Sequence, residues 1–353
     1  MSSIYGKNIK ISIFGQSHSE AIGVTVDGLP AGFEIDMNEL GKFMSRRSSK
    51  GKSYATKRVE ADIPEFICGL VNGTTCGAPL TAIIRNENVK SSDYDNLSST
   101  PRPSHADYTA ELKYGGFQDK SGGGHFSGRL TAPLCIAGAV CKQILEQQGI
   151  LFYSHIKSIK DINDIPFNAL NPQDTSDKDF PVIDETKKLK MLDTIEIARK
   201  NSDSVGGVVE CAITGVPAGL GEPIFDGLEN RISKIIFGIP AVKGIEFGNG
   251  FNSTLLYGSE NNDEFILKND EVVTQTNNSG GILGGISSGM PIVFSVAVKP
   301  TPSIGLPQRS VNLCEMEETT IQISGRHDPC IVPRAVPCVE AAAAIAILDT
   351  LLD

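Results

Sequence analysis

The sequence has no long uninterrupted apolar run. A helix that crosses a bilayer needs roughly 20 consecutive apolar residues, and no stretch of the chain approaches that length. Residues 1–7 also lack the apolar core of a signal peptide. We therefore expect a protein that does not interact with a membrane and that resides in the cytoplasm.

Paired cysteines are missing as well. The eight cysteines stand singly, without a C-x-x-C pair and without a His/Cys cluster at zinc-binding spacing. Two of them, Cys135 and Cys141, fall inside a predicted helix, where a small apolar thiol packs well. We expect reduced cysteines and no metal site.

The chain also lacks a positive net charge. The formal charge is −10, which opposes binding to nucleic acid, because phosphate backbones need a positive surface. Charge is uneven, however: residues 41–60 hold seven basic side chains against one acidic one. Such a patch fits an anionic small molecule, and it equally fits a solvated basic loop.

The elements that are present favour a layered α+β arrangement. Hydrophobic residues make up 40% of the chain, enough for a large core. Strand and helix patterns are mixed without the regular alternation of a Rossmann sheet. We predict one domain over residues 1–353, with an exposed polar excursion at 160–184. Predicted strands lie at 9–13, 23–26, 80–85, 207–214, 291–298 and 319–324, and predicted helices at 129–148, 185–201, 228–237 and 339–352.

Two histidines share one local setting. In Ser17-His18-Ser19-Glu20 and in Ser104-His105-Ala106-Asp107, an imidazole lies between a hydroxyl and an acid. Histidine titrates near neutral pH, and a neighbouring carboxylate favours its protonated form. The repetition indicates a pair of proton donors, although a single histidine in a polar loop more often caps or hydrogen bonds.

Glycine and proline mark the other candidate segments. A glycine loop at 121–128 runs into an apolar helix, a junction that exposes N–H groups to an anion, but it carries no nucleotide fingerprint. The glycines of 277–289 allow a flat ring to approach the backbone, and tight turns explain them equally well. Prolines in 299–303 and 325–337 stiffen the backbone around charged side chains, as a pre-organised site requires.

Taken in their order along the chain, eight short segments of this sequence resemble the chorismate synthase family. The resemblance implies a β-α-β sandwich with helices packed between antiparallel sheets, assembled as a homotetramer. It also implies a lyase that forms chorismate from 5-enolpyruvylshikimate 3-phosphate by 1,4-anti elimination of phosphate, in the shikimate pathway of aromatic amino acid biosynthesis. A flavin-dependent oxidoreductase acting on an anionic small molecule remains the alternative. The matching segments are 14–18, 26–32, 46–47, 102–107, the glycine loop, 241–244, 280–289 and 325–337.

The resemblance implies reduced FMN as cofactor, without net redox change, and NADPH as a candidate reductant of the flavin. His105 matches a histidine that protonates the departing phosphate, and His18 one that protonates the reduced flavin. Asp328 matches an aspartate that helps to move the ring proton. Ser17 and Ser127 match hydroxyls that support this proton transfer.

Binding residues follow from the same resemblance. Forked guanidinium groups bind carboxylate and phosphate at two points, which makes arginines of the matching segments candidates for holding the substrate: Arg46, Arg47, Arg129 and Arg334. The family's usual arginine is replaced here by His125. The positions that match flavin contacts are His125, Phe126, Ser127, Pro240, Ala241, Gly284, Lys299, Pro300, Thr301, Pro302, Ser303 and Arg326. His155 lies outside every motif and is expected to have no catalytic role.

Overall fold

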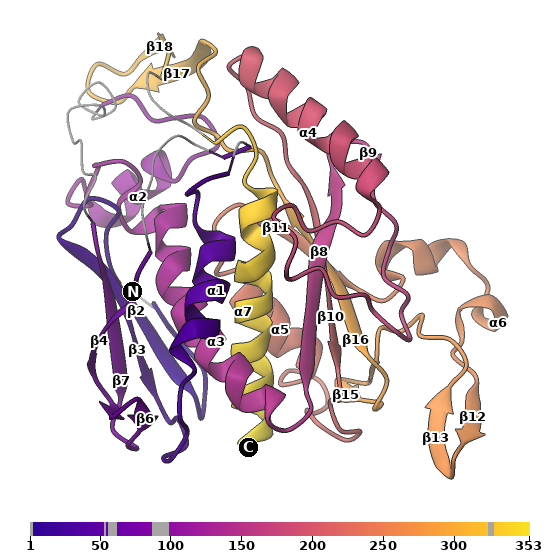
Figure 1. The fold of residues 1–353 in the computed structure, drawn as a ribbon. Coiled ribbons are helices and arrows are strands. Elements are labelled where there is room, and N and C mark those ends of the chain that lie inside the picture. The colour runs from indigo at the N-terminus through magenta and orange to yellow at the C-terminus, as the bar shows by residue number, and fades with distance from the viewer. Residues whose placement is uncertain (1–2, 53, 56–61, 87–98, 324–327) are drawn as a thin grey trace.

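Two five-stranded antiparallel sheets enclose a layer of helices (Figure 1). The structure is a computed structural model of the chain, and it describes residues 3–52, 54–55, 62–86, 99–323 and 328–353. The expected α+β sandwich, with helices packed between antiparallel sheets, is confirmed.

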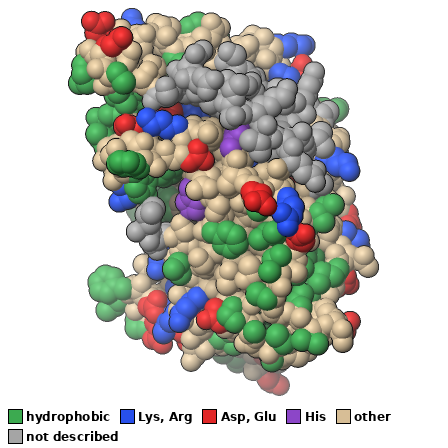
Figure 2. Space-filling model, turned by 90° about the vertical axis from the view of Figure 1, so that its left-hand side faces the viewer, with side chains coloured by type: hydrophobic (Ala, Val, Ile, Leu, Met, Phe, Trp, Pro, Cys, Tyr) green, Lys and Arg blue, Asp and Glu red, His purple; other side chains and the backbone are tan. Residues whose placement is uncertain are grey.

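The first sheet comes from the N-terminal part of the chain. Its buried face is apolar because alternate residues of each strand point inward, among them Ile11, Ile22 and Val24. Its outer face and edges retain exposed apolar residues such as Phe14 and Ile67, and Figure 2 shows apolar side chains grouped on this side of the molecule. The strand order is β1 (Ile4–Tyr5), β2 (Lys10–Gly15), β3 (Ala21–Asp27), β7 (Leu80–Arg85) and β4 (Glu65–Cys68), with a small separate hairpin of β5 (Leu70–Val71) and β6 (Thr74–Thr75).

The second sheet is covered on both faces. Its inner face packs on helices, and Phe167 and Ile183 pack on its outer face against Ala212 and Val293. The segment 160–184, expected to be an exposed excursion, is therefore partly buried, because its apolar residues cover this sheet. The strand order is β11 (Val242–Phe247), β16 (Ile292–Val298), β10 (Gly207–Thr214), β8 (Leu151–Ile159) and β9 (Ile162–Asn163).

The central layer holds two helices that are apolar around most of their circumference, as a helix enclosed on all sides must be. In α7 (Val332–Leu351) almost every residue is buried, and α3 (Thr131–Glu146) is buried from Thr131 to Cys141. The two pack very closely: a Cβ on Gly138 would lie 2.3 Å from the Cβ of Ala341. Also in this layer are α1 (Met37–Arg47) and α5 (Leu228–Ile236).

The C-terminal helix starts earlier than the sequence suggested. It begins at Val332 rather than at residue 339, and both Pro333 and Pro337 are helical. Pro333 is tolerated in the first turn because its missing N–H would have no partner there, whereas Pro337 lies inside the helix and gives up one of its hydrogen bonds. These two prolines therefore belong to the helix, and Pro329 precedes it.

The remaining elements lie around this sandwich. The hairpin of β12 (Phe265–Lys268) and β13 (Glu271–Thr274) projects from the body (Figure 1). Among the described residues, no helix combines the length and apolar character needed to span a bilayer. The others are α2 (Asp107–Tyr114), η2 (Gly124–Phe126), η3 (Gly128–Leu130), α4 (Glu185–Lys200), η4 (Gly250–Leu255), α6 (Gly258–Asn261), β14 (Ile282–Leu283), β15 (Ile286–Ser287), β17 (Gln308–Asn312) and β18 (Glu317–Ile321).

Candidate active site

His18 lies against the glycine loop that precedes α3. It occupies the connection between β2 and β3, and its Nδ1 is 3.0 Å from the Ser17 hydroxyl. That hydroxyl donates to the Ser121 carbonyl at 3.1 Å. Only glycine fits at residue 122, because a Cβ there would lie 2.4 Å from Cε1 of His18. The glycine loop thus fixes the position of the imidazole.

The similarity between the two histidine segments ends at their acids. Glu20 turns outward to pair with Arg85, and its side chain is 88% exposed. His105, in contrast, places Nδ1 2.5 Å from Oδ1 of Asp107. Of the two expected imidazole–carboxylate pairs, the structure forms the one at His105.

Arg102 holds the carboxylate of Asp107. Its Nε and Nη2 donate to the two carboxylate oxygens at 2.7 and 2.8 Å. Burial alone raises the pKa of Asp107, but the hydrogen bonds from Arg102 and His105 outweigh it, so the pKa lies below its usual value. Asp107 is therefore charged at neutral pH. Arg102 has no role in the sequence-based assignment, although it opens the same motif.

Arg102 also connects the two histidines. Its Nη2 donates to the carbonyl of Gly122 at 2.7 Å, and its Nη1 to the Ser303 hydroxyl at 3.2 Å. Lys299 Nζ donates to the carbonyl of Ser104 at 2.5 Å. The segment that carries His105 is thus bound to the glycine loop on one side and to residues 299–303 on the other.

Asp328 joins this network through residues 299–303. The hydroxyl of Thr301 donates to the carbonyl of Asp328 at 2.9 Å. Arg334, in the first turn of α7, donates from Nη1 to Oδ2 of Asp328 at 2.8 Å and from Nε to the carbonyl of Arg47 at 2.9 Å. Through these hydrogen bonds and the chain 299–303, the structure links the segments that hold His18, His105 and Asp328.

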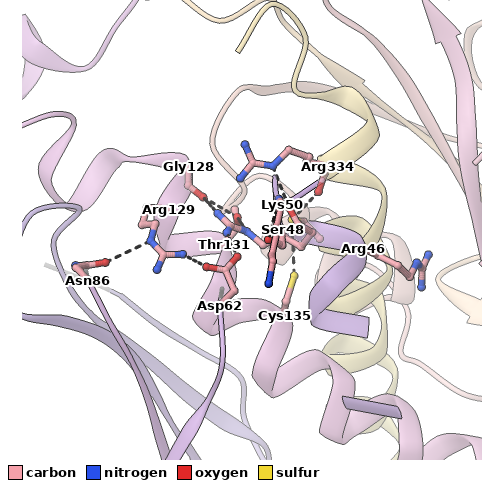
Figure 3. A network of polar contacts seen from close by, with 12 residues as sticks. Arg46, Ser48, Lys50, Asp62, Asn86, Gly128, Arg129, Thr131, Cys135 and Arg334 are labelled. Atoms are coloured by element: carbon pink, nitrogen blue, oxygen red, sulfur yellow. Dashed lines mark hydrogen bonds and ion pairs between the residues drawn. The ribbon is translucent and has the colours of Figure 1, made fainter. Parts of the chain in front are cut away.

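A buried carboxylate links two of the expected substrate-binding arginines. Asp62, which is 2% exposed, lies between Arg47 and Arg129 and pairs with both (Figure 3). Burial raises the pKa of Asp62, but the two guanidinium groups outweigh it and lower the pKa overall. Arg47 also donates to the Thr131 hydroxyl at 3.1 Å and to the Gly128 carbonyl at 3.0 Å. Protein groups engage each nitrogen of the Arg47 side chain. Arg47 therefore contributes positive charge and holds Asp62 in place, but it does not offer a guanidinium edge for two-point binding of an anion.

Arg46 does not join this cluster, although the family resemblance made it a candidate for binding substrate beside Arg47. It pairs with the buried Glu340 at 2.7 Å and points away from Asp62 and Arg129 (Figure 3). Consecutive residues of a helix face different directions, so α1 cannot present both arginines to one side. Arg46 instead lines a separate cavity of about 470 Å³ together with Lys52 and Lys142.

Most expected flavin positions lie near the network. The backbone N–H of Lys299 donates to the carbonyl of Ala241 at 3.0 Å, which places Pro240 and Ala241 beside residues 299–303. Phe126 lines one pocket with His105. Ser127 accepts a hydrogen bond from the N–H of Arg129 at 3.2 Å and so caps the start of η3.

Two expected flavin positions are not brought there, and a third is not described. His125 turns toward β2, where its ring nitrogens contact the Ser3 hydroxyl at 2.7 Å and the Gly15 carbonyl at 2.8 Å, so neither is available to a flavin. Gly284 lies in the turn between β14 and β15, which come before β16 in the sequence, whereas Lys299 follows β16. That strand is roughly 20 Å long at about 3.3 Å per residue, and Gly284 does not precede it directly. Arg326 lies outside the described residues.

Of the lysines near the network, Lys299 was expected from the family resemblance, whereas Lys52 was not assigned a role. Burial lowers the pKa of Lys52 to about 8, and Arg334, Arg46 and Arg47 act in the same direction. Burial and the charge of Lys243 lower the pKa of Lys299. The sequence feature that could have indicated Lys52 is the basic segment 41–60. Composition alone does not distinguish an anion-binding patch in this segment from a solvated loop.

Comparison with known proteins gives matches along almost the whole chain. A sequence profile of the family described as "Chorismate synthase" matches residues 9–352. A chorismate synthase of Lancefieldella parvula is 48% identical over 99% of this chain and 96% of its own length. One of Thermococcus kodakarensis is 47% identical over 98% of this chain and 97% of its own. A solved structure described as "Crystal Structure of Chorismate Synthase" superposes with a TM-score of 0.78 at 27% identity, covering 99% of this chain and 93% of that one.

Proposed function

The chain belongs to the chorismate synthase family of carbon–oxygen lyases, and from this premise we propose that it eliminates phosphate from 5-enolpyruvylshikimate 3-phosphate to give chorismate, with reduced FMN as cofactor. The observation that carries the proposal is the set of hydrogen bonds that ties together the segments holding His18, His105 and Asp328. These residues come from distant parts of the sequence and supply the acid and base that a 1,4-elimination needs.

The residues around 299–303 suit a flavin phosphate. Lys299 and Lys243 lie close enough for their charges to interact, and paired cations are what an anionic cofactor requires. We assign the flavin to residues 299–303 with Pro240, Ala241, Phe126 and Ser127, and we leave out His125 and Gly284. Bound reduced FMN would supply the transient electron donation that lets phosphate leave without net redox change.

The chain's own residues would handle the protons. His105 would donate from Nε2 to the departing phosphate, because its Nδ1 is engaged by Asp107. His18 would hold a proton for the reduced flavin, oriented by Ser17. Asp328, kept in place by Arg334, would accept the proton lost from the ring. Arg129 and Arg334 would attract the substrate anions, while Arg47 and Asp62 fix Arg129 in place.

An anaerobic assay with dithionite-reduced FMN tests the reaction. We expect phosphate release from 5-enolpyruvylshikimate 3-phosphate with no lasting oxidation of the flavin. Stoichiometric oxidation of the flavin would instead support the flavin-dependent oxidoreductase. Repeating the assay in air with NADPH and FMN tests whether NADPH serves as the reductant.

Replacing His105 tests its role directly. His105→Ala should lower kcat by about 10²- to 10⁴-fold, the usual contribution of a general acid, while FMN still binds. Turnover is measured from phosphate release, and FMN affinity is measured from flavin fluorescence. Near-normal turnover would remove His105 from the mechanism.

We also propose a homotetramer located in the cytoplasm. Large apolar side chains are exposed on η4 and on β12, among them Phe251, Leu255, Phe265 and Leu267, and contact between subunits would remove them from water. Light scattering on the eluting protein would give the mass of the assembly, and a monomer would contradict the tetramer.

A further inference from the structure

We propose that Asp107, clamped by Arg102, is a positioning residue that fixes His105 in one tautomer, with Nε2 as the atom that donates the proton. This inference rests on the proposed function and refines it at the same site. It assigns a role to two residues that the sequence-based site did not include.

The tautomer follows from the acceptor. Asp107 is a carboxylate, so the short contact to its Oδ1 requires a hydrogen on Nδ1 of His105. Within the described part of the chain Nε2 makes no hydrogen bond, and the imidazole lines a pocket shared with Gly123 and Phe126. A proton carried by Nε2 is therefore the one that can leave toward a substrate.

Hydrogen-bond donors engage both carboxylate oxygens of Asp107. Oδ2 accepts from Nε and from the backbone N–H of Arg102, at 2.7 and 3.0 Å. Oδ1 accepts from Nη2 of Arg102 and from Nδ1 of His105. Arg102 is itself buried, with a side chain 5% exposed. The carboxylate cannot rotate away from the imidazole without breaking several charge-assisted hydrogen bonds.

The guanidinium group also lies near the imidazole. Nη2 of Arg102 is 3.0 Å from Nδ1 of His105, and both atoms carry hydrogens when Asp107 is charged. Their mutual repulsion is offset by Oδ1 of Asp107, to which both donate. If that negative charge were removed, the arginine would disfavour the imidazolium.

Other charged groups face the same pocket. They are Glu111 and Lys120, which pair with each other at 2.9 Å, and Asp119. Lys299 contacts the carbonyl of Ser104 on the other side. Asp107 is the carboxylate in hydrogen-bond contact with His105, so its charge is the one that most favours the imidazolium.

The proton balance is simple. The Nε2 proton moves to an oxygen of the departing phosphate, and the Nε2–H bond electrons remain on the ring as a lone pair. The Nδ1–H bond to Asp107 persists throughout, so the neutral product tautomer is ready to take up a proton again at Nε2. Without Asp107, the neutral ring is free to carry its hydrogen on either nitrogen.

The test compares Asp107→Asn with Glu196→Gln, an exposed carboxylate of α4 away from the pocket. Asp107→Asn should lower kcat by about 10- to 100-fold, the loss seen when metal-ligating histidines lose their carboxylate partner, and leave KM almost unchanged. On the alkaline side, activity should also be lost at a lower pH than in the unaltered enzyme, because the imidazolium has lost its counter-charge. Glu196→Gln should change none of these properties. An unaltered pH profile in Asp107→Asn would overturn the proposal.

Two further measurements separate the positioning role of Asp107 from a folding defect and from the proposed function itself. Nitrogen-15 NMR of the histidine-labelled enzyme should show neutral His105 with its hydrogen on Nδ1, and a hydrogen on Nε2 would overturn the positioning role. Should Asp107→Asn fail to fold, Arg102→Lys should shift the pH profile in the same direction. A correct tautomer in an enzyme that releases no phosphate would uphold the positioning and refute the proposed function.

Discussion

Lys52 is a partly buried lysine that lies near three arginines. Burial lowers its pKa to about 8, against an ordinary value of 10.5, and Arg334, Arg46 and Arg47 act in the same direction. Between these two pH values the unfolded chain binds more protons than the folded one, so stability from this group rises with pH. Below pH 8 both states are protonated, and the full electrostatic cost of the buried charge remains.

Lys52→Met should therefore stabilise the protein at neutral pH, and this advantage should shrink as the pH rises from about 8 toward 10.5. Urea unfolding of both proteins at several pH values measures it. Lys190→Met, at an exposed position of α4, is the matched control and should show a small effect. A difference that stays constant with pH would contradict the assignment.

Candidate residues of the site could be selected from the sequence where a short motif carries them. His18, His105 and Asp328 each lie in such a motif, and the structure links the segments that hold them. The partners were not predictable, because Asp62 reaches Arg129 across 67 residues and Arg102 reaches Ser303 across 201. Arg46 and Arg47 are adjacent in the sequence, which suggested one binding surface, while helical geometry turns them apart.

At the scale of elements, a buried ion cluster fastens the segment 164–184 to the second sheet. His155 contacts Asp164 at 3.1 Å and Glu210 at 3.0 Å through its two ring nitrogens. Burial lowers the pKa of His155, but both carboxylates outweigh it and the pKa is raised. The hydrogen bonds from His155 and Lys157 overcome burial at Glu210 and lower its pKa to about 2. Asp164 in turn accepts from the backbone of Ile183 and Asp184.

His155→Ala should cost about 3–5 kcal/mol of stability, because it leaves the buried Asp164 without its cation and Glu210 with Lys157 alone. Hydrogen exchange should become faster in residues 164–184, while α3 remains protected. The loss should be greatest below the unfolded pKa near 6.5 and should diminish as pH rises through the raised folded value, where the imidazolium deprotonates. His125→Ala, at an exposed histidine, serves as the control, and equal losses in both variants would refute the cluster.

The sequence predicted α3, α4, α5 and α7 and the strands β2, β3, β7, β10, β16 and β18, but it missed other elements and some boundaries. Helix α4 and strand β10 were predicted within a residue, because their patterns are bounded by capping or turn residues. The start of α7 was missed because proline was taken as a sign of a loop. Strand β8 was not predicted, and it is buried on both faces at Ser154 to Ile156, which removes the alternation that reveals a strand.

At the scale of the whole molecule, close packing of α3 on α7 makes the two sheets interdependent. A Cβ at Gly138 would meet the Cβ, Cα and carbonyl oxygen of Ala341 at 2.3 to 2.6 Å. Gly138→Ala should therefore cost about 1–3 kcal/mol. Gly41→Ala, on α1 with nothing within 4 Å of its Cβ, should be neutral or stabilise by up to about 1 kcal/mol.

Calorimetry of these two variants measures both effects and also tests the expected single domain. Because α3 and α7 serve both sheets, we expect one unfolding transition that moves to lower temperature in Gly138→Ala. Two separate transitions, one for each sheet, would contradict a single domain. Equal shifts for the two glycine variants would contradict the role of the close helix contact.

The overall architecture was only partly derivable from residue patterns. Mixed strands and helices favoured an α+β fold, but β7 inserts between β3 and β4, and β16 between β11 and β10. Such an order depends on long-range pairing, which local patterns do not encode. The arrangement of layers came from the family resemblance instead.

The helix that fills the centre of the sandwich follows both sheets in the sequence. Asp349 near its end accepts hydrogen bonds from the backbone of Lys7, Asn8 and Ile9, which lie about 340 residues earlier. During synthesis, the parts of both sheets that α7 covers therefore stay open to water until α7 itself has been made. Apolar surface exposed in this interval is a surface through which an incompletely folded chain can aggregate.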